Sequence, residues 1–113
     1  MVKRGALREP SYFILTCLLD GPRHGYGIAE DAEALSGGRV VLTAGTLYGA
    51  LDRLVAEQSI AVDREEVVSG RMRRYYRLTQ DGHALVLAEA DRLRAAASVS
   101  SAATRRRLRM RSA

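Results

Sequence analysis

The sequence predicts a mainly α-helical fold with one small β-hairpin. Three segments between Pro10 and Ala56 place apolar residues at helical spacing, and from Ile60 to Thr79 the period changes to two. Three helices followed by a hairpin whose outer end carries arginines is the element order of a winged helix-turn-helix. The length of 113 residues suits one small domain with one modest hydrophobic core.

The first helix is expected to begin at Pro10, which can take the first helical position. A mostly apolar run follows, and Gly21 with Pro22 supplies a stop, so we expect about a dozen mostly buried residues. Cys17 lies in this run and is the only cysteine, which excludes an internal disulfide. We therefore predict that Cys17 is a buried small hydrophobe rather than a reactive thiol.

The second helix is expected to be short and amphipathic. Ile28, Ala32 and Leu35 recur at spacings of four and three residues, and Gly37 follows as a C-terminal cap. The next stretch, RVVL at 39–42, is expected to be a short extended piece.

The third helix has two unlike faces. Its apolar side comprises Leu47, Ala50, Leu51, Leu54 and Val55. The opposite side carries Thr46, Gly49 and Arg53, and Thr43 is a plausible N-cap. Taken alone, this pattern also suits an ordinary surface helix with a solvated back.

The front of the third helix, TAGTLY, favours docking on DNA. A recognition helix enters the major groove by its N-terminal residues, whose backbone amides and small hydroxyls suit phosphates and base edges. Gly45 would let the backbone approach closely, and Thr43 and Thr46 would donate hydrogen bonds. The hydroxyl of Tyr48 would reach a phosphate while its ring packs on the body of the domain.

The hairpin allows two registers. A two-residue turn at 69–70 would set Leu78 opposite Ala61, whereas a three-residue loop, 68–70, would set Leu78 opposite Ile60. The second register places apolar side chains opposite each other, so we prefer it. It also suits a left-handed Gly70.

Further out, the preferred register has electrostatic consequences. It places Glu65 opposite Arg73, an exposed ion pair worth little, and Arg64 opposite Arg74. Two like charges facing each other are unfavourable unless an anion lies between them. A DNA phosphate would serve.

The distribution of charge limits where nucleic acid could bind. The net charge is +5, yet residues 1–91 hold eleven basic and thirteen acidic residues, a net charge of −2. Seven arginines and no acids follow from Arg92 to the end. Within the body the basic cluster is Arg71, Arg73, Arg74 and Arg77, in a stretch without acids.

Three motifs in series resemble the PadR-type transcriptional regulators: HGYGI at 24–28, GTLYGALDRL at 45–54 and RRYYRLTQDG at 73–82. The resemblance, to the short-tailed members, implies a dimeric bacterial repressor with a winged-helix DNA-binding domain. It carries a DNA-contact role onto Tyr26, Thr46, Tyr48 and the wing arginines. Two departures are Gly49, where many members have proline, and EQSI at 57–60, which replaces a common Glu-Gly pair.

The residues expected to contact DNA therefore come from the second helix, the third helix and the hairpin. They are Tyr26, Thr43, Thr46, Tyr48, Arg53, Arg64, Arg71, Arg73 and Arg74. The partner would be double-stranded DNA carrying an inverted-repeat operator.

The C-terminal part is expected to form a further helix with Thr79 as a possible N-cap. Val86, Ala90, Leu93 and Ala97 share one side of it, which suits either packing within the chain or a dimerisation arm. The family resemblance favours the arm. We thus expect a winged-helix domain at 1–80, a C-terminal dimerisation helix at 81–98 and a mobile basic tail at 99–113, for which DNA contact is a lesser alternative.

Other functions find little support in the sequence. His24 and His83 are isolated, so no metal site is predicted, and no catalytic or cofactor-binding constellation is present. The longest apolar run is too short to cross a bilayer and the first residues do not form a signal peptide, so we expect a soluble, cytoplasmic protein. Two hypotheses follow: a homodimeric DNA-binding regulator, which a small-molecule effector could control, and a winged-helix module that binds protein without reading DNA.

Overall fold

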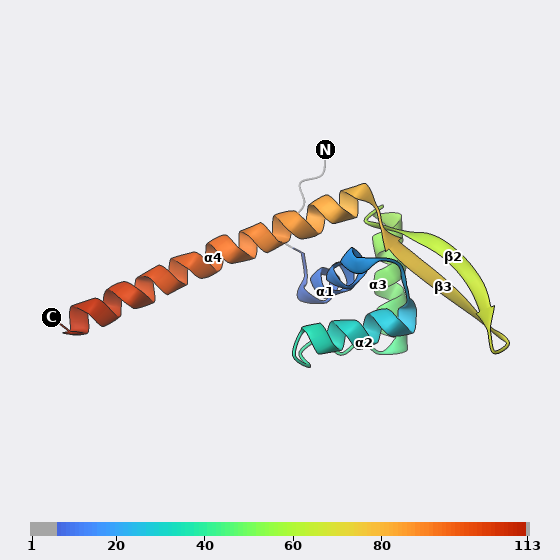
Figure 1. Ribbon diagram of the computed structural model, residues 1–113, viewed down its shortest axis with the longest axis horizontal. Helices are drawn as coiled ribbons and strands as arrows, with labels where there is room; N and C mark the ends of the chain where they lie inside the picture. Colours follow the sequence, from blue (N-terminus) through green and yellow to red (C-terminus); the bar gives the residue numbers. More distant parts are fainter. Residues whose placement is uncertain (1–6, 113) are drawn as a thin grey trace.

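The structure, a computed structural model, describes residues 7–112. The elements in chain order are α1 (Glu9–Cys17), the 3₁₀ turn η1 (Leu18–Asp20), β1 (Arg23–His24), α2 (Gly25–Leu35), α3 (Ala44–Ala56), β2 (Ile60–Val68), β3 (Arg71–Leu78) and α4 (Gln80–Ser112). The strands form one antiparallel sheet in the order β1-β3-β2. The first three helices gather beside this sheet, the β2–β3 hairpin projects on one side, and α4 extends on the other as a long rod (Figure 1).

The first two helices begin and end for reasons visible in the sequence. Pro10 lies in the first turn of α1, as predicted, and the last predicted turn is the 3₁₀ turn η1. His24 caps α2, because its Nδ1 accepts the Gly27 N–H at 3.2 Å. Gly37 and Gly38, with φ of 65° and 87°, then end α2, since their N–H groups donate to the Ala34 and Glu33 carbonyls.

One prediction near α2 is wrong, and another stays untested. Leu35, expected on the apolar face, is 55% exposed. Residues 39–42, expected to be extended, belong to no strand of the sheet, and Val40 is buried with Cys17 and Ala32 in a second small apolar cluster. The third strand is β1, directly before α2, which local pattern could not indicate because it exists only by pairing with β3.

Helix α3 presents its predicted apolar side to the core. Leu47, Leu51 and Leu54 are buried, and Thr43 holds the N-cap position. The Thr43 hydroxyl, however, donates to the Thr46 hydroxyl at 3.2 Å rather than accepting a backbone N–H. At the other end Gln58 takes the left-handed conformation, with φ of 63°, that glycine usually supplies after a helix.

The hairpin combines features of both predicted registers. Ile60 lies opposite Leu78 as preferred, but the turn has only two residues, Ser69 and Gly70, both with positive φ. The difference is absorbed by a β-bulge at Asp63, between Val62 and Arg64.

Because of this bulge, the predicted pairing beyond Val62 is wrong by one residue. Arg64 lies opposite Tyr75 and Glu65 lies opposite Arg74. The expected repulsion between Arg64 and Arg74, and the phosphate it would require, therefore have no basis in the structure.

The core lies where the three helices meet the base of the sheet and the start of α4. The buried members of this cluster are Ile14, Leu15, Leu18, Ile28, Leu47, Ala50, Leu51, Leu54, Ile60, Tyr76 and Val86. Every helix and both long strands contribute, so burial of this surface orients the hairpin and α4 relative to α3.

Helix α4 starts in close contact with the base of the hairpin. The Thr79 hydroxyl accepts the Gly82 N–H at 3.0 Å, which confirms the predicted N-cap, and it also hydrogen-bonds the Ser59 carbonyl at 3.0 Å. Helix continues through Ser112, past residue 99, where the sequence predicts that the helix gives way to a mobile tail. No glycine or proline interrupts residues 83–112, and alanine and arginine favour helix.

Candidate nucleic-acid interface

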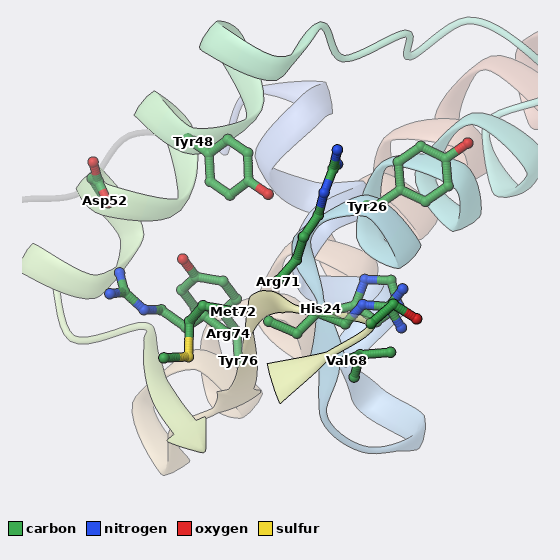
Figure 2. A pocket seen from close by; sticks show the side chains of 12 residues that line it. His24, Tyr26, Tyr48, Asp52, Val68, Arg71, Met72, Arg74 and Tyr76 are labelled. Carbon is green, nitrogen blue, oxygen red and sulfur yellow. The ribbon is translucent and has the colours of Figure 1, made fainter. Parts of the chain in front are cut away.

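An open groove of about 670 Å³ separates the front of α3 from the wing, the name used here for β2, β3 and their turn. Its walls also include the N-terminus of α2 (Figure 2). The lining residues are His24, Gly25, Tyr26, Tyr48, Asp52, Val68, Ser69, Arg71, Met72, Arg73, Arg74 and Tyr76. Five of the nine residues predicted to contact DNA are among them: two tyrosines and three arginines.

The two tyrosines stand at the mouth of this groove. Tyr48 is 48% exposed and Tyr26 is 68% exposed. The Tyr48 ring lies against Gly25, where an added Cβ would be 2.9 Å from its hydroxyl oxygen. Gly25 thus allows α2 and α3 to approach closely, and the Tyr48 ring packs on this contact while the residue stays half exposed.

The front turn of α3 is open to solvent next to the groove. Thr43, Gly45 and Thr46 are exposed, and nothing lies within 4 Å of a Cβ built on Gly45. The first backbone amides of a helix have no intrahelical acceptor, so this exposed turn offers hydrogen-bond donors to an anion or a base edge.

Most wing arginines are already paired with carboxylates of the same hairpin. Arg74 Nε lies 3.3 Å from Glu65, and Arg64 lies 3.1 Å from Asp63 and 3.9 Å from the centre of the Tyr75 ring. The pKa of Arg74 is raised, chiefly by its hydrogen bond to the Tyr76 hydroxyl and then by Glu65. These arginines therefore carry little uncompensated charge.

Arg71 and Arg73 differ from the other wing arginines. Both are exposed, and no ion pair found among residues 7–112 involves either one. The wing from Ile60 to Leu78 holds five arginines and three acids, so its net charge of +2 equals the charge of these two side chains. In Figure 2 the Arg71 guanidinium points into the space between Tyr26 and Tyr48.

Arg53 is exposed on α3 but lies outside the groove, so its predicted DNA contact stays a prediction. Its guanidinium donates to the buried Ser11 hydroxyl of α1 at 2.9 Å, and it is not among the residues that line the groove. Helical spacing places Arg53 seven residues beyond Thr46 on the same side of α3, and its hydrogen bond to Ser11 also joins α3 to α1.

Asp52 and Tyr76 line the groove, although the sequence did not connect either residue with DNA binding. Asp52 lies one turn after Tyr48 on α3, a spacing that could have placed it in the groove. Tyr76 lies at the groove floor and is 2% exposed. Burial raises the pKa of Tyr76, so its hydroxyl stays protonated and holds Arg74 in place.

The predicted dimerisation residues do not share one environment. Val86 is 2% exposed and belongs to the core of its own chain, so its assignment to a dimer seam is wrong. Ala90 is half-buried, Leu93 is 42% exposed and Ala97 is exposed. The exposed part of this side of α4 therefore begins at Leu93, about two turns after Val86.

Among residues 7–112, three other kinds of site were considered from the sequence: a membrane span, a metal centre and a reactive thiol. No helix in that range is long and apolar enough to cross a membrane. The same residues hold no group of three or more His, Cys, Asp or Glu side chains suited to a metal ion. Cys17 is buried, and burial raises the pKa of its thiol to about 11, so the reactive thiolate is scarce at neutral pH.

Comparison with known proteins gives a curated relative and solved structures. An uncharacterized 37.1 kDa protein in transposon TN4556 of Streptomyces fradiae is 44% identical over 82 residues, which are 73% of this chain. The chain spans only 22% of the length of that relative.

Two solved structures are similar in both fold and sequence. A PadR family transcription regulator from Clostridium difficile R20291 has a TM-score of 0.70 and 25% identity, over 83% of this chain and 96% of that one. Bacillus subtilis PadR in complex with operator DNA has a TM-score of 0.62 and 25% identity, over 76% of this chain and 47% of that one.

The family comparison covers most of the winged-helix fold. The model of the transcriptional regulator PadR-like family matches residues 14–88, from the middle of α1 to the second turn of α4. Members of this family regulate transcription and are not enzymes. The chain belongs to the PadR-like family of transcriptional regulators.

Proposed function

We propose that this regulator binds an inverted-repeat operator as a homodimer and represses transcription. The observation that carries the proposal is that Arg71 and Arg73, which form no ion pair among residues 7–112, line one open groove with Tyr26 and Tyr48. The Arg71 guanidinium points between the two tyrosines (Figure 2). A winged helix that places its recognition helix in the major groove holds one sugar-phosphate strand between that helix and the wing. The groove offers cations and hydroxyls at that position.

The contacts divide into positioning and reading groups. Tyr26, Tyr48, Arg71 and Arg73 would bind phosphates, which sets the register of the protein on the duplex but reads no sequence. The front turn of α3, with Thr46 exposed beside Gly45, would meet base edges. Arg74 and Arg64 would contribute less, because Glu65 and Asp63 already neutralise them.

The dimer would form through the exposed part of α4. Leu93 and Ala97 lie on the side of the helix that is buried against the body one to two turns earlier, and beyond the body this side is exposed. A two-fold pairing there would set two α3 helices about one DNA turn apart, roughly 34 Å, so the operator should be an inverted repeat.

An effector, where one exists, could act through the joint between α4 and the wing. Thr79 hydrogen-bonds the carbonyls of Gln58 and Ser59 and also caps α4. A change in the packing of α4 at the dimer interface would therefore move the base of the hairpin and the spacing of the two recognition helices. This route couples dimer geometry to operator affinity.

The experiment is to select duplexes from a random pool with the purified protein and then titrate the selected and random duplexes over a salt series. We expect an inverted repeat and a steep fall in affinity with salt, because each neutralised phosphate adds about 0.9 to the slope. Tyr48→Phe should weaken operator binding while leaving the fold intact, since only a hydroxyl is removed. Failure to select any duplex would contradict the proposal.

One observation favours the second candidate, a protein-binding module. Residues 1–91 have a net charge of −2, and the groove itself contains the carboxylate of Asp52. Binding of DNA that is weak and equal for all sequences, together with a groove variant such as Arg71→Gln that leaves this binding unchanged, would favour that candidate.

A further inference from the structure

The last two turns of α4 carry an unusual concentration of positive charge. Five arginines lie between residues 105 and 111: Arg105, Arg106, Arg107, Arg109 and Arg111. All five are exposed, and no ion pair among residues 7–112 involves them. The last acid before them is Asp91, which pairs with Arg94.

The helix divides these arginines between two sides. At about 100° per residue, Arg105, Arg106 and Arg109 fall within roughly 100° of arc. Arg107 and Arg111 fall on the opposite side, in line with Leu93, which is 14 residues before Arg107. We call the first group the outer arginines and the second group the inner arginines.

Inner and outer arginines have different surroundings along α4. The inner side is the one that packs on the body through Val86 and Glu89 near the start of the helix. The outer side faces away from that contact over the whole length of α4. A dimer formed through Leu93 and Ala97 would therefore cover the inner side and leave the outer arginines free.

The outer arginines repel one another as placed. Arg105 and Arg109 are four residues apart and Arg106 and Arg109 are three apart, the two spacings at which like charges destabilise a helix. A dense anion lying along this side would remove the repulsion and stabilise the last turns of α4. The charge pattern thus fits an extended polyanion better than a single carboxylate.

The carboxylates of the protein are poor candidates for this partner. All thirteen lie within residues 7–112, and at least seven already form ion pairs with arginines of the same chain. Planar guanidinium groups bind phosphate oxygens in a bidentate manner and are only weakly hydrated, so this binding costs little desolvation.

A membrane surface fits no better. An interfacial helix needs one apolar face, yet Leu108 and Met110 are about 160° apart on α4 and arginines lie on both sides between them. The chemistry of this segment therefore favours the phosphates of a nucleic acid.

We propose that the outer arginines form a second DNA-binding element, which holds phosphates at a different stretch of duplex from the one that the wing of the same subunit holds. The proposal rests on operator binding by the groove. The two DNA-binding elements would lie far apart, because α4 runs away from the wing along the longest dimension of the molecule, which is 69 Å (Figure 1). The element reads no base, so it adds affinity and salt dependence without adding sequence preference.

The test compares two variants that remove equal charge from opposite sides of α4. Arg105→Gln with Arg109→Gln changes the outer side, and Arg107→Gln with Arg111→Gln changes the inner side at the same spacing. Each full-length variant is titrated over a salt series with a selected operator duplex that carries a helical turn of flanking DNA on each side. Circular dichroism and sedimentation confirm that fold and dimer are retained.

The outer variant should lower the slope of log affinity against log salt by about 0.9 for each phosphate that is no longer neutralised, up to about 3.6 for a dimer. The inner variant should leave the slope near that of the wild type. An equal fall of the slope in both variants would mean that only the total charge matters, and no fall in either would mean that these arginines do not bind DNA. Both results overturn the proposal.

Two further outcomes separate this proposal from operator binding. A wild-type protein that selects no duplex would refute operator binding itself, whereas a wild type that binds its operator with both variants unchanged would refute only the second element. Vesicles of phosphatidylglycerol provide the last comparison. If the wild type binds them and the outer variant does not, while the DNA affinity of that variant is retained, the outer arginines belong to a membrane surface and the proposal is overturned.

Discussion

Replacing Gly82 with alanine should destabilise the protein strongly, because a Cβ at this position has no room. It would lie 1.9 Å from the Ser59 carbonyl oxygen and 2.9 Å from the Ser59 carbonyl carbon. These are backbone atoms at the joint between α3 and the wing, and the Ser59 side chain is buried. No rotation of a side chain could relieve the contact, so α4 would have to move away from the joint.

The magnitude follows from what that movement breaks. The Ser59 carbonyl accepts hydrogen bonds from the Thr79 N–H at 3.1 Å and the Thr79 hydroxyl at 3.0 Å. Losing two such bonds costs about 1–3 kcal/mol, and overpacking costs about 1–3 kcal/mol more. Alanine regains up to about 1 kcal/mol of helix propensity. The free energy of unfolding should therefore fall by about 3 kcal/mol, which lowers Tm by roughly 10–15 °C.

A second helical glycine supplies the matched control. Nothing lies within 4 Å of a Cβ built on Gly49, in the middle of α3. Gly49→Ala should raise the free energy of unfolding by about 0.5–1 kcal/mol, because alanine loses less backbone entropy on folding. The same chemical change thus has opposite signs at the two positions.

The assay is thermal and urea denaturation followed by far-ultraviolet circular dichroism at one fixed protein concentration, since a dimer would make Tm depend on concentration. The reasoning is refuted if Gly82→Ala is as stable as the wild type, or if both alanine variants shift in the same direction. Either result would mean that α4 does not dock on Ser59 as closely as described.

Three other substitutions test separate parts of the structure. Gln58→Gly should raise the free energy of unfolding by about 0.5–1 kcal/mol in urea denaturation, since glycine adopts the left-handed φ of 63° without steric strain. An unchanged urea midpoint would mean that Gln58 is not strained. Arg71→Gln should weaken operator binding by about 1 kcal/mol per subunit and lower the salt slope. Arg74→Gln should weaken binding less, because Glu65 pairs with Arg74. If fluorescence anisotropy gave the reverse order of affinities, the groove would not be the DNA-binding site. Leu93→Glu should yield a monomer in sedimentation, while the exposed control Leu87→Glu should stay dimeric, and two dimers would remove α4 as the arm.

The sequence alone determined the order and type of most elements, because the signals for them are local. Helical spacing identified the buried side of α3, and Thr79 and Gly37 marked the ends of helices through contacts with residues three or four positions away. The period of two predicted the wing, and the front of the third helix pointed to Tyr48; the family motifs added Tyr26. None of these inferences needs a partner distant in the chain.

Only the tertiary structure decided which side chains are free to bind. The bulge at Asp63 shifts the outer hairpin by one residue, so Glu65 pairs with Arg74 and not with Arg73, the partner that the predicted register gave it. A period of two is the same before and after such a shift, which is why alternation along a strand could not reveal it.

The same reason accounts for the other differences between pattern and structure. Val86 shares its side of α4 with Leu93, yet it lies in the core while Leu93 is 42% exposed, because the body ends between them. Arg53 follows Thr46 on α3 but donates to Ser11, 42 residues earlier in the chain. Periodicity assigns a residue to a side of an element, whereas burial and pairing depend on which distant element covers that side at that point.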